Sequence, residues 1–327
     1  MKKILVLGGT GFLGYYTTEE LLRKGYEVKS VALPPMPVDD LFSSDKVENI
    51  LADINDLSDE EVLELLEDVD GLMYAIGADE RVVPDAPAYS FFYEANVLPT
   101  QRLARLAAEA GLESFVVYGS YFAEFAEGIT DVDLRSEAYP STRLLQEQVA
   151  FAEGEGKMRV SSLRLPYIFG NMPGRMPLWK MFADRVKDQA VFPVLKGGTA
   201  AVTVEQVAQA AVGALEKGKH RGTYALGGIN LSHKDFMDRI VKAIGQEDST
   251  EIPVVPLEAV IENYRKIDEQ TAAAGKEHGM HMEMIAEMNN RDLFIDPTEV
   301  MEELGYEEDD VDAAIDRTLE IIAKEYE

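Results

Sequence analysis

Residues 4–14 read Ile-Leu-Val-Leu-Gly-Gly-Thr-Gly-Phe-Leu-Gly. A run of β-favouring apolar residues ends abruptly in glycines, and an amphipathic stretch with helical spacing follows from Tyr15 to Lys24. A strand, a glycine turn and a helix in this order form a cradle for phosphate. The glycines let backbone N–H groups approach a pyrophosphate, and the helix N-terminus adds partial positive charge. The stretch therefore predicts a dinucleotide site, in preference to a tight turn without a ligand, and its contact residues are Gly8, Thr10, Gly11, Phe12, Leu13 and Gly14.

The glycines fit two templates. Gly9-x-Gly11-x-x-Gly14 is the dinucleotide fingerprint of classical dehydrogenases, and Gly8-x-x-Gly11-x-x-Gly14 is the form used by short-chain dehydrogenases. A glycine motif alone is weak evidence. Its place between an apolar strand and an amphipathic helix makes the prediction more specific.

Composition narrows the class of protein. The chain has 327 residues, of which 46% are hydrophobic, and no cysteine, which excludes disulfides and thiolate metal sites. The formal net charge of −29 argues against nucleic acid and anionic membranes as partners, because both would be repelled. No apolar run approaches the length of a membrane span, and the N-terminal apolar run is too short for a signal peptide. We expect a cytoplasmic protein that acts on a small-molecule substrate.

Strand-like and helix-like segments alternate along most of the chain. This rhythm predicts an α/β fold with a Rossmann-type, doubly wound parallel sheet and a smaller C-terminal substrate lobe. The dinucleotide-binding domain is expected to span 1–170, with 200–230 returning to it, and the lobe to comprise 171–199 and 231–327. The expected strands are 3–7, 27–32, 47–51, 70–76, 114–119, 159–165 and 222–226, and the expected helices are 12–24, 59–67, 91–110, 138–153 and 204–217.

The residues after the second and third strands bear on the cofactor. An acidic residue after the second strand would bind a ribose 2′-hydroxyl and an arginine would bind a 2′-phosphate, but the chain has Leu33 there. The sequence therefore does not decide between NAD and NADP, and Lys29 is the first candidate for a reader of NADP. Asp53 follows the third strand, where it would accept a hydrogen bond from an adenine amino group or serve as an ordinary helix-capping or turn residue.

Tyr139 is either a candidate acid–base group or part of an ordinary pair on a surface helix, and its spacing from Arg143 alone does not decide between the two. Tyr139 and Arg143 open a helix at spacing i, i+4 and share one face. A cation beside a phenol stabilises the phenolate, which would make the tyrosine a better acid–base group near neutral pH. Ser120 ends a strand, where its hydroxyl would hold a carbonyl oxygen beside the tyrosine or serve as a turn residue.

Several motifs in the same order resemble the extended branch of the short-chain dehydrogenase/reductase superfamily, the NAD-dependent epimerase/dehydratase group. They are Gly8–Gly14, Ala52-Asp53, Asp70–Gly77, Asn96–Thr100, Phe115–Ser120, Tyr139–Arg143, Leu163–Gly170 and Glu303–Tyr306. The resemblance implies that Tyr139 is the acid–base residue, with Ser120 as its partner and Arg143 holding the phenolate and a cofactor ribose. It also implies cofactor contacts by Asp53, Ile54, Tyr74, Ala75, Ile76, Gly77, Asn96, Pro166 and Ile168.

The chain departs from the family pattern at the catalytic helix and beside it. The family has Tyr-x-x-x-Lys, whereas residue 143 is arginine, whose planar fork differs from a compact ammonium. Pro99 stands where glycine is usual, and Tyr121 stands where a small residue is usual. The expected function is oxidoreduction, epimerisation or dehydration of a small polar substrate such as a nucleotide sugar. The alternative is a non-catalytic NAD(P)-binding sensor.

The remaining candidates concern the substrate, a metal and assembly. Tyr121, Asn171 and Arg175 are expected at the substrate, although an ordinary surface role for Arg175 is equally compatible with the sequence. Met172, Met176 and Trp179 indicate an apolar lid. His278, His281 and Glu283 lie in a predicted helical insertion at 257–292, and we favour an exposed or partner-facing helix over a metal site. A homodimer through helices 97–110 and 138–153 would use Leu103, Leu106, Ala107, Leu144, Leu145 and Val149, unless these residues cover the sheet.

Overall fold

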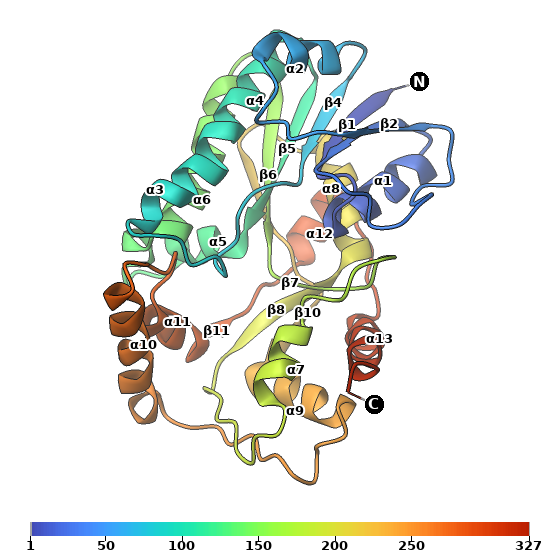
Figure 1. Cartoon of the computed structure of the whole chain (residues 1–327). Helices are drawn as coiled ribbons and strands as arrows, with labels where there is room; N and C mark the ends of the chain where they lie inside the picture. Colours follow the sequence, from blue (N-terminus) through green and yellow to red (C-terminus); the bar gives the residue numbers. More distant parts are fainter. Residues whose placement is uncertain (1, 327) are drawn as a thin grey trace.

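A computed structural model describes residues 2–326 and shows a central seven-stranded parallel sheet (Figure 1). The strand order is β3-β2-β1-β4-β5-β6-β9, so the chain crosses over between β3 and β4. This order confirms the predicted doubly wound α/β fold. The strands are β1 (Lys3–Leu7), β2 (Glu27–Ala32), β3 (Val47–Leu51), β4 (Gly71–Tyr74), β5 (Ser114–Ser120), β6 (Arg159–Leu165) and β9 (Gly222–Ala225).

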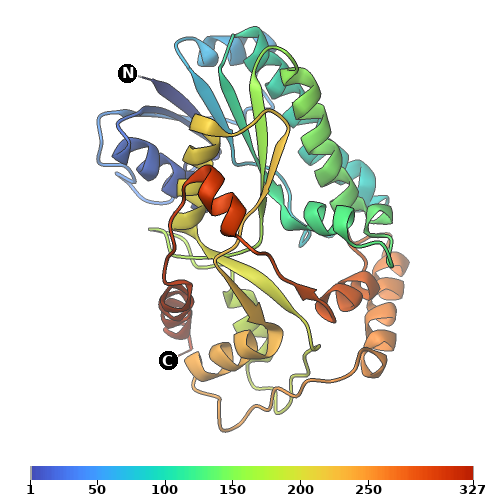
Figure 2. The same ribbon diagram turned by 180° about the vertical axis from the view of Figure 1, so that it is seen from behind.

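Helices cover both faces of this sheet (Figure 2). One face packs against α1 (Phe12–Arg23), α8 (Val204–Lys217) and α12 (Thr298–Leu304), and the other against α2 (Asp59–Leu66), α4 (Leu98–Glu109) and α6 (Ala138–Gly154). The inner strands are buried on both sides, which explains why β1 and β4 read as nearly unbroken apolar runs. The contact between α8 and α12 is close: a Cβ on Gly213 would lie 2.0 Å from the carbonyl oxygen of Leu304.

The predicted helix at 91–110 is interrupted. It begins earlier, as α3 (Ala88–Phe92), continues as a π-helical turn (η1, Tyr93–Val97) and only then becomes α4. Pro99 lies in the first turn of α4. It has no N–H to donate, and its ring would clash with the carbonyl four residues earlier if the preceding turn were a regular α-helix. The extra residue of the π turn accommodates this proline.

A second sheet forms the core of the C-terminal lobe. β8 (Gly198–Thr203) pairs with β7 (Tyr167–Phe169), β10 (Ile229–Ser232) and β11 (Asp292–Leu293). Its apolar cluster includes Phe169, Trp179 and Phe236 and is covered by α7 (Lys180–Val186), α9 (His233–Ala243) and α13 (Val311–Ala323). Trp179 is therefore a core residue, and its predicted place in an apolar lid is wrong. The strands of this sheet are short, and β8 consists mainly of small residues, so they gave no clear pattern in the sequence.

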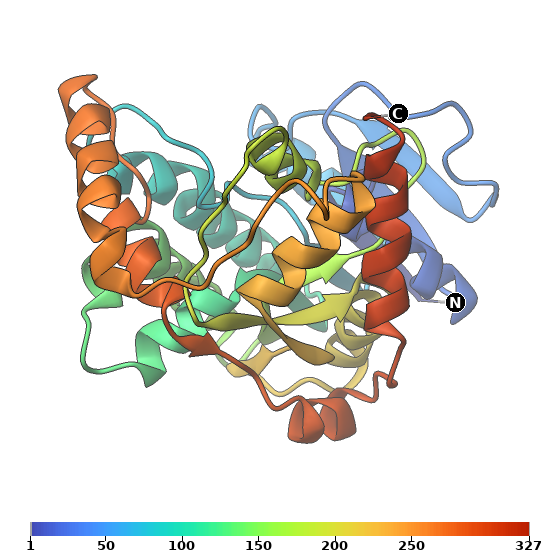
Figure 3. The ribbon, with the colours of Figure 1, turned by 90° about the horizontal axis from the view of Figure 1, so that it is seen from below.

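The predicted insertion at 257–292 is helical for most of its length. It contains the short turn η3 (Leu257–Ala259), α10 (Ile261–Ala273) and α11 (Met282–Asn289), and α10 stands at the opposite side of the lobe from α13 (Figure 3). The helices α5 (Tyr121–Gly128) and η2 (Leu134–Ser136) complete the described elements. No helix within residues 2–326 is long and apolar enough to cross a membrane.

The apolar residues expected at a dimer interface are mostly covered by their own chain. Leu103, Leu106 and Ala107 pack beneath α4 against the sheet, and Leu144 lies in a cluster with Phe122. These four residues are buried, and only Leu145 and Val149 stay partly exposed. The apolar argument for a dimer is therefore wrong for four of its six residues, because they serve the core.

Candidate functional site

The glycine turn after β1 has the geometry of a phosphate cradle. A Cβ on Gly9 would lie 2.2 Å from the Ser30 hydroxyl, and one on Gly14 would lie 2.1 Å from the Gly8 carbonyl, so both glycines are required for packing. Gly8 has φ +81°, a conformation that favours glycine. Gly11 differs, because its backbone is extended and a Cβ there would meet only the Gly8 carbonyl, at 3.1 Å. Its open side leaves the N-terminus of α1 accessible to a ligand.

The other predicted residues of the turn are divided between the turn and the core. Thr10 is buried, whereas Phe12 and Leu13 are partly exposed. Phe12 packs with Tyr16 at an edge-to-face centroid distance of 5.9 Å, and Leu13 packs on the cluster beneath α1. These side chains hold the turn and the start of α1 in place.

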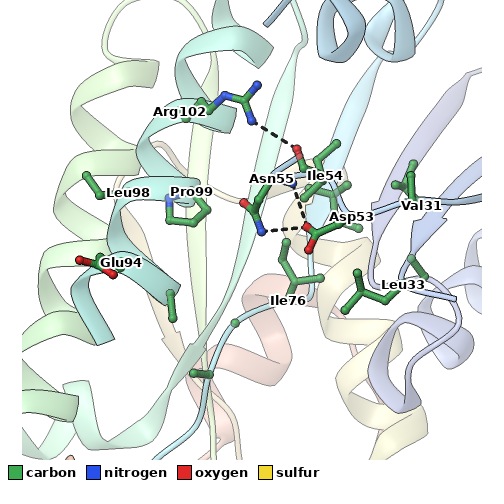
Figure 4. A pocket seen from close by; sticks show the side chains of 16 residues that line it. Val31, Leu33, Asp53, Ile54, Asn55, Ile76, Glu94, Leu98, Pro99 and Arg102 are labelled. Carbon is green, nitrogen blue, oxygen red and sulfur yellow. Dashed lines mark hydrogen bonds between the residues drawn. The ribbon is translucent and has the colours of Figure 1, made fainter. Parts of the chain in front are cut away.

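A cavity of about 670 Å³ opens at the carboxyl ends of β1, β2 and β4 (Figure 4). This is the edge of a parallel sheet at which ligands bind. The cavity contains the predicted residues Asp53, Ile54, Ile76 and Gly77. Its other lining residues, which the sequence analysis did not name as cofactor contacts, include Leu33, Asn55, Glu94, Leu98, Pro99 and Arg102.

The aspartate and the arginine of this cavity shape its wall. Asp53 Oδ1 accepts hydrogen bonds from the Asn55 backbone N–H (2.9 Å) and side-chain Nδ2 (3.1 Å). Arg102 donates to the Ile54 carbonyl (3.2 Å) and to Asp59 Oδ1 (2.8 Å), so it ties α4 to the loop after β3. Glu94, Leu98 and Arg102 recur at helical spacing before and along α4, which was the available signal for this wall.

Lys29 cannot read a 2′-phosphate in this fold. Its side chain is buried, and Nζ donates to the Leu65 carbonyl (2.9 Å) beneath α2. The prediction of Lys29 as the first candidate reader is therefore wrong, because its place on β2 directs the ammonium away from the cavity. Leu33, the uncharged residue that follows β2, is 61% exposed and lines the cavity.

The loop after β4 is fixed by a buried asparagine. Asn96 is fully buried, and its side chain accepts from the Ala78 N–H (2.8 Å) and donates to the Ala78 carbonyl (3.0 Å). Gly77 has φ +139°, and a Cβ there would lie 2.6 Å from Asn96 Oδ1. Asn96 thus holds the loop that lines the cavity. Tyr74, by contrast, is fully buried and stacked on Phe115, so its side chain does not line the cavity, and its contact with a cofactor stays a prediction.

Ser120, Tyr139 and Arg143 come together at the end of β5. Tyr139 lies in the first turn of α6, and the Arg143 guanidinium carbon lies 5.6 Å from the centre of its ring. Arg143 donates to the Tyr118 carbonyl, while its Nε is buried without a partner. Arg143 Nη1 lies 3.9 Å from the position of a Cβ on Gly77, which connects this cluster to the cavity. Ser120 Oγ accepts from the Phe122 N–H (3.2 Å), which leaves its O–H free to donate.

The expected phenolate at Tyr139 is not favoured in this state. Burial raises the pKa of Tyr139 to about 12, although the nearby Arg143 cation and a hydrogen bond from Ser120 lower it. Glu80 and Asp79, on the loop after β4, raise the pKa further through their negative charge. Tyr139 therefore carries its proton at neutral pH, and the sequence argument from Arg143 alone omitted the cost of burial.

The predicted substrate residues lie in different surroundings. Tyr121 is buried, stacks edge-on against Phe125 at 5.4 Å, and accepts a hydrogen bond from Thr199 (3.4 Å). The backbone carbonyl of Asn171 accepts a hydrogen bond from the Tyr16 hydroxyl, and the side-chain Oδ1 of Asn171 is buried without a partner. Arg175 is exposed and does not line the cavity, so the structure favours its surface role.

The segment around Asn171 lies against the start of α1, where Tyr16 donates to the Asn171 carbonyl. Ile168 lies on β7, half-buried against the main cluster, and Pro166 is buried just before it. Met172 packs with Leu41 and Phe42, whereas Met176 is 43% exposed. Met172 is therefore part of a small apolar cluster, and an apolar lid around it stays a prediction.

The histidines of the insertion bind carboxylates. His278 lies 3.1 Å from Asp268, and His281 lies 2.9 Å from Glu137. Both histidines precede α11, and the His278 side chain is largely buried whereas that of His281 is 45% exposed. The expected exposure is therefore wrong for His278, and a partner-facing helix stays a prediction. Among residues 2–326, no group of three or more His, Cys, Asp or Glu side chains has the arrangement of a metal site.

The glycine cradle, the cavity at the sheet edge and the adjoining Ser120, Tyr139 and Arg143 define a Rossmann-type dinucleotide-binding fold. A family model matches residues 4–227, and the chain belongs to the NAD dependent epimerase/dehydratase family. The resemblance read from the sequence motifs is thereby confirmed.

Individual relatives are distant. Human "Sterol-4-alpha-carboxylate 3-dehydrogenase, decarboxylating" is 25% identical over 183 residues, which cover 52% of this chain and 45% of the relative. The chain thus spans less than half the length of this curated relative. Among solved structures, gox2253 has a TM-score of 0.76 at 19% identity, covering 99% of both chains. UDP-glucose 4-epimerase from Bifidobacterium longum, in complex with NAD+ and UDP, has a TM-score of 0.69 at 18% identity, covering 99% of this chain and 98% of its own. At these identities the structures support the fold.

Proposed function

We propose that this protein binds NAD or NADP and catalyses oxidoreduction, epimerisation or dehydration of a small polar substrate, such as a nucleotide sugar. The observation that carries the proposal is the continuity between the cavity and the catalytic cluster. The cavity begins beside the glycine turn and reaches Gly77, and the Arg143 guanidinium lies directly beyond it. The complex of the similar UDP-glucose 4-epimerase with NAD+ and UDP supports the assignment.

The residues present fit a dinucleotide. The open side of Gly11 gives a pyrophosphate access to the N-terminus of α1, and Asp53 and Ile54 line the part of the cavity that would hold adenine. The buried Arg143 Nε has no partner in the protein, and a ribose hydroxyl would give it one. When bound, the nicotinamide supplies the acceptor or donor of hydride.

The three polar side chains have separate roles in the proposed chemistry. The Tyr139 hydroxyl exchanges a proton with the substrate oxygen, acting as an acid from its protonated state. The Ser120 O–H, which hydrogen-bonds Tyr139 in the absence of a substrate, orients that oxygen. The Arg143 cation stabilises the charge that develops on the phenol when the proton leaves.

The test removes the phenolic oxygen and keeps the ring. In Tyr139→Phe, turnover should fall by about a hundredfold or more, which is the contribution of acid–base catalysis, while NAD(P) affinity stays nearly unchanged. Hydride transfer is followed by nicotinamide absorbance against nucleotide sugars, aldehydes and ketones. Isomer formation is assayed separately, because epimerisation leaves no net absorbance change. Unchanged turnover in Tyr139→Phe would exclude the proposed role of this residue.

The second candidate is a non-catalytic NAD(P) sensor. Two observations favour it: arginine stands at residue 143, and Tyr139 is 3% exposed with a raised pKa. Arg143→Lys separates the candidates, because an enzyme adapted to the arginine fork should lose activity. Absence of turnover in the wild type, together with activity in Arg143→Lys, would establish the sensor and exclude the enzyme.

We also propose a homodimer. Its interface would include the face of α6 on which Leu145 and Val149 remain partly exposed, and not the four buried residues. Light scattering over a range of concentrations decides this. A monomer at every concentration would exclude the dimer.

A further inference from the structure

The segment 275–281 joins α10 to α11 and lies beside the N-terminal ends of α3 and α6 (Figure 1). We call it the brace. It is far in sequence from the catalytic cluster, yet it touches two of the segments that surround Tyr139. Its contacts assign a role to the insertion at 257–292.

The brace first binds the loop that leads into α3. The Glu277 N–H donates to the Pro84 carbonyl (3.1 Å), and the Ala86 N–H donates to the Gly275 carbonyl (2.9 Å). Glu277 Oε2 also accepts from the Ala88 N–H (2.7 Å), one of the donors that a helix leaves free in its first turn. These bonds hold the end of the loop that begins at Gly77 and carries Glu80.

The brace then binds the start of α6. The Tyr139 N–H donates to the Gly279 carbonyl at 2.6 Å, which gives this first-turn donor a partner. The buried Glu137 carboxylate accepts from the His281 N–H (2.7 Å) and lies 2.9 Å from His281 Nδ1. Glu137 is the N-cap residue of α6 but does not cap its own helix, so its side chain serves the brace.

Gly279 sits where no side chain fits. A Cβ there would lie 2.3 and 2.6 Å from two ring atoms of Phe92 and 3.1 Å from the Tyr139 Cβ. The Phe92 ring in turn packs edge-on against the Tyr139 ring, with centroids 5.4 Å apart. The catalytic candidate is therefore enclosed between the brace and Phe92, and a shift at residue 279 would be passed to its ring.

The hairpin behind the brace is anchored by Asp268 of α10. Its carboxylate accepts from the backbone N–H groups of Met282 (2.8 Å) and Glu283 (3.0 Å), which are the first two residues of α11. A carboxylate at a helix N-terminus is favourable for hydrogen bonding and for charge. The brace thus enters α11 from a fixed point and is not a free loop.

We propose that the brace is a positioning element that fixes the Tyr139 ring relative to Ser120 and Arg143, and that Gly279 is its essential residue. The catalytic consequence rests on the proposed function, whereas the positioning itself does not. Gly279 is a positioning residue, because it acts through Tyr139 and touches no reacting atom.

The test is Gly279→Ala, with Gly128→Ala as the matched control, because a Cβ on Gly128 would meet nothing within 4 Å. Both proteins are labelled at tyrosine Cζ, and the Tyr139 signal is assigned by its loss in Tyr139→Phe. We expect Gly279→Ala to move the Tyr139 signal and Gly128→Ala to leave it in place. An unmoved Tyr139 signal in folded Gly279→Ala overturns the proposal without any assay of turnover.

Kinetics provide the second measurement. A displacement of about 1 Å can cost about a hundredfold in rate, so kcat should fall by roughly tenfold to a hundredfold in Gly279→Ala while KM and the cofactor Kd change less than about twofold. A parallel loss of cofactor affinity, or an unchanged kcat, contradicts positioning. If the wild type has no turnover, the proposed function fails, and the Tyr139 signal alone decides the brace.

A double variant covers the case in which Gly279→Ala does not fold. Phe92→Leu removes the two ring atoms that the new Cβ would strike, so Gly279→Ala/Phe92→Leu should fold and recover part of the wild-type position of the Tyr139 signal. Failure of the double variant to fold, when Phe92→Leu alone folds, would show that residue 279 acts on the fold as a whole and would overturn the proposal.

Discussion

Gly11→Val is the perturbation that most directly tests the phosphate cradle. The backbone of Gly11 is extended, with φ −86° and ψ 171°, so a β-branched residue can adopt it. A Cβ there would meet only the Gly8 carbonyl, at 3.1 Å, which is tight but not prohibitive. The protein should therefore fold, with a loss of about 1 kcal/mol because valine is a poor N-cap residue.

The effect on the cofactor should be much larger than the effect on the fold. Valine methyl groups would occupy the open side through which a pyrophosphate approaches the N-terminus of α1. Loss of one hydrogen bond to a charged group costs about 1.5–3 kcal/mol, which corresponds to a rise in Kd of roughly tenfold to a hundredfold.

Isothermal calorimetry with NAD(H) and NADP(H) measures the affinities, and differential scanning calorimetry measures the unfolding midpoints. Gly14→Ala is the contrasting variant, because its Cβ would lie 2.1 Å from the Gly8 carbonyl and should destabilise the fold itself. Wild-type affinity in Gly11→Val would refute the assignment of the turn as the pyrophosphate site, as would a wild type that binds neither cofactor at millimolar concentration.

Three further predictions concern cofactor choice, pH and the core. The affinities for NAD and NADP should differ by well under the roughly 2–3 kcal/mol of a charged contact, because Leu33 is uncharged and Lys29 is buried elsewhere; a hundredfold preference in calorimetry would contradict this. The hydrogen bond with Glu137 raises the pKa of His281 to about 9, despite partial burial, and Asp268 and Glu277 add to the rise. The stabilising contribution of His281 is therefore complete below about pH 6.5 and lost as the pH rises through 9, so the difference in unfolding midpoint between wild type and His281→Ala should shrink from pH 6 to pH 10. Arg164→Met should lower the free energy of unfolding by about 3–5 kcal/mol, because it leaves the buried Glu147 carboxylate without its cation, and Arg164→Met/Glu147→Met should be less harmful in denaturant titrations; equal losses would contradict the pairing.

The main sheet could be predicted from the sequence because its signals are local. Lys3–Leu7 is an apolar run that ends in glycines, Arg159–Leu165 ends at Pro166, and the observed bounds of both strands match the predicted ones. The π turn at Tyr93–Val97 was missed because it depends on how a single proline fits between two helices. The second sheet was missed because its strands are short, and β8 is rich in small residues and gains its identity only through pairing with three partners.

Some features of the candidate site could likewise be predicted from local sequence, whereas others depend on distant parts of the chain. The glycine turn and the Tyr139–Arg143 pair are local patterns. The turn follows β1 and Arg143 donates to Tyr118 at the end of β5, so both lie at the same edge of the parallel sheet. The direction of a side chain such as Lys29, and the burial that raises the pKa of Tyr139, depend on elements distant in sequence. No local sequence pattern predicts that residue 279 must be glycine. The requirement comes from contact with Phe92, which lies nearly two hundred positions earlier in the chain.

The contact of Gly213 on α8 with Leu304 on α12 affects the order in which parts of the chain can fold during synthesis. During synthesis the strands and α8 emerge long before α12, so the part of α8 that α12 covers stays exposed to water until residue 304 has left the ribosome. A nascent chain stopped after β9 would contain nearly every residue of the family match and still lack this cover. Completion of the nucleotide-binding half is therefore a late, long-range event, and a fragment ending near residue 227 should expose apolar surface and aggregate.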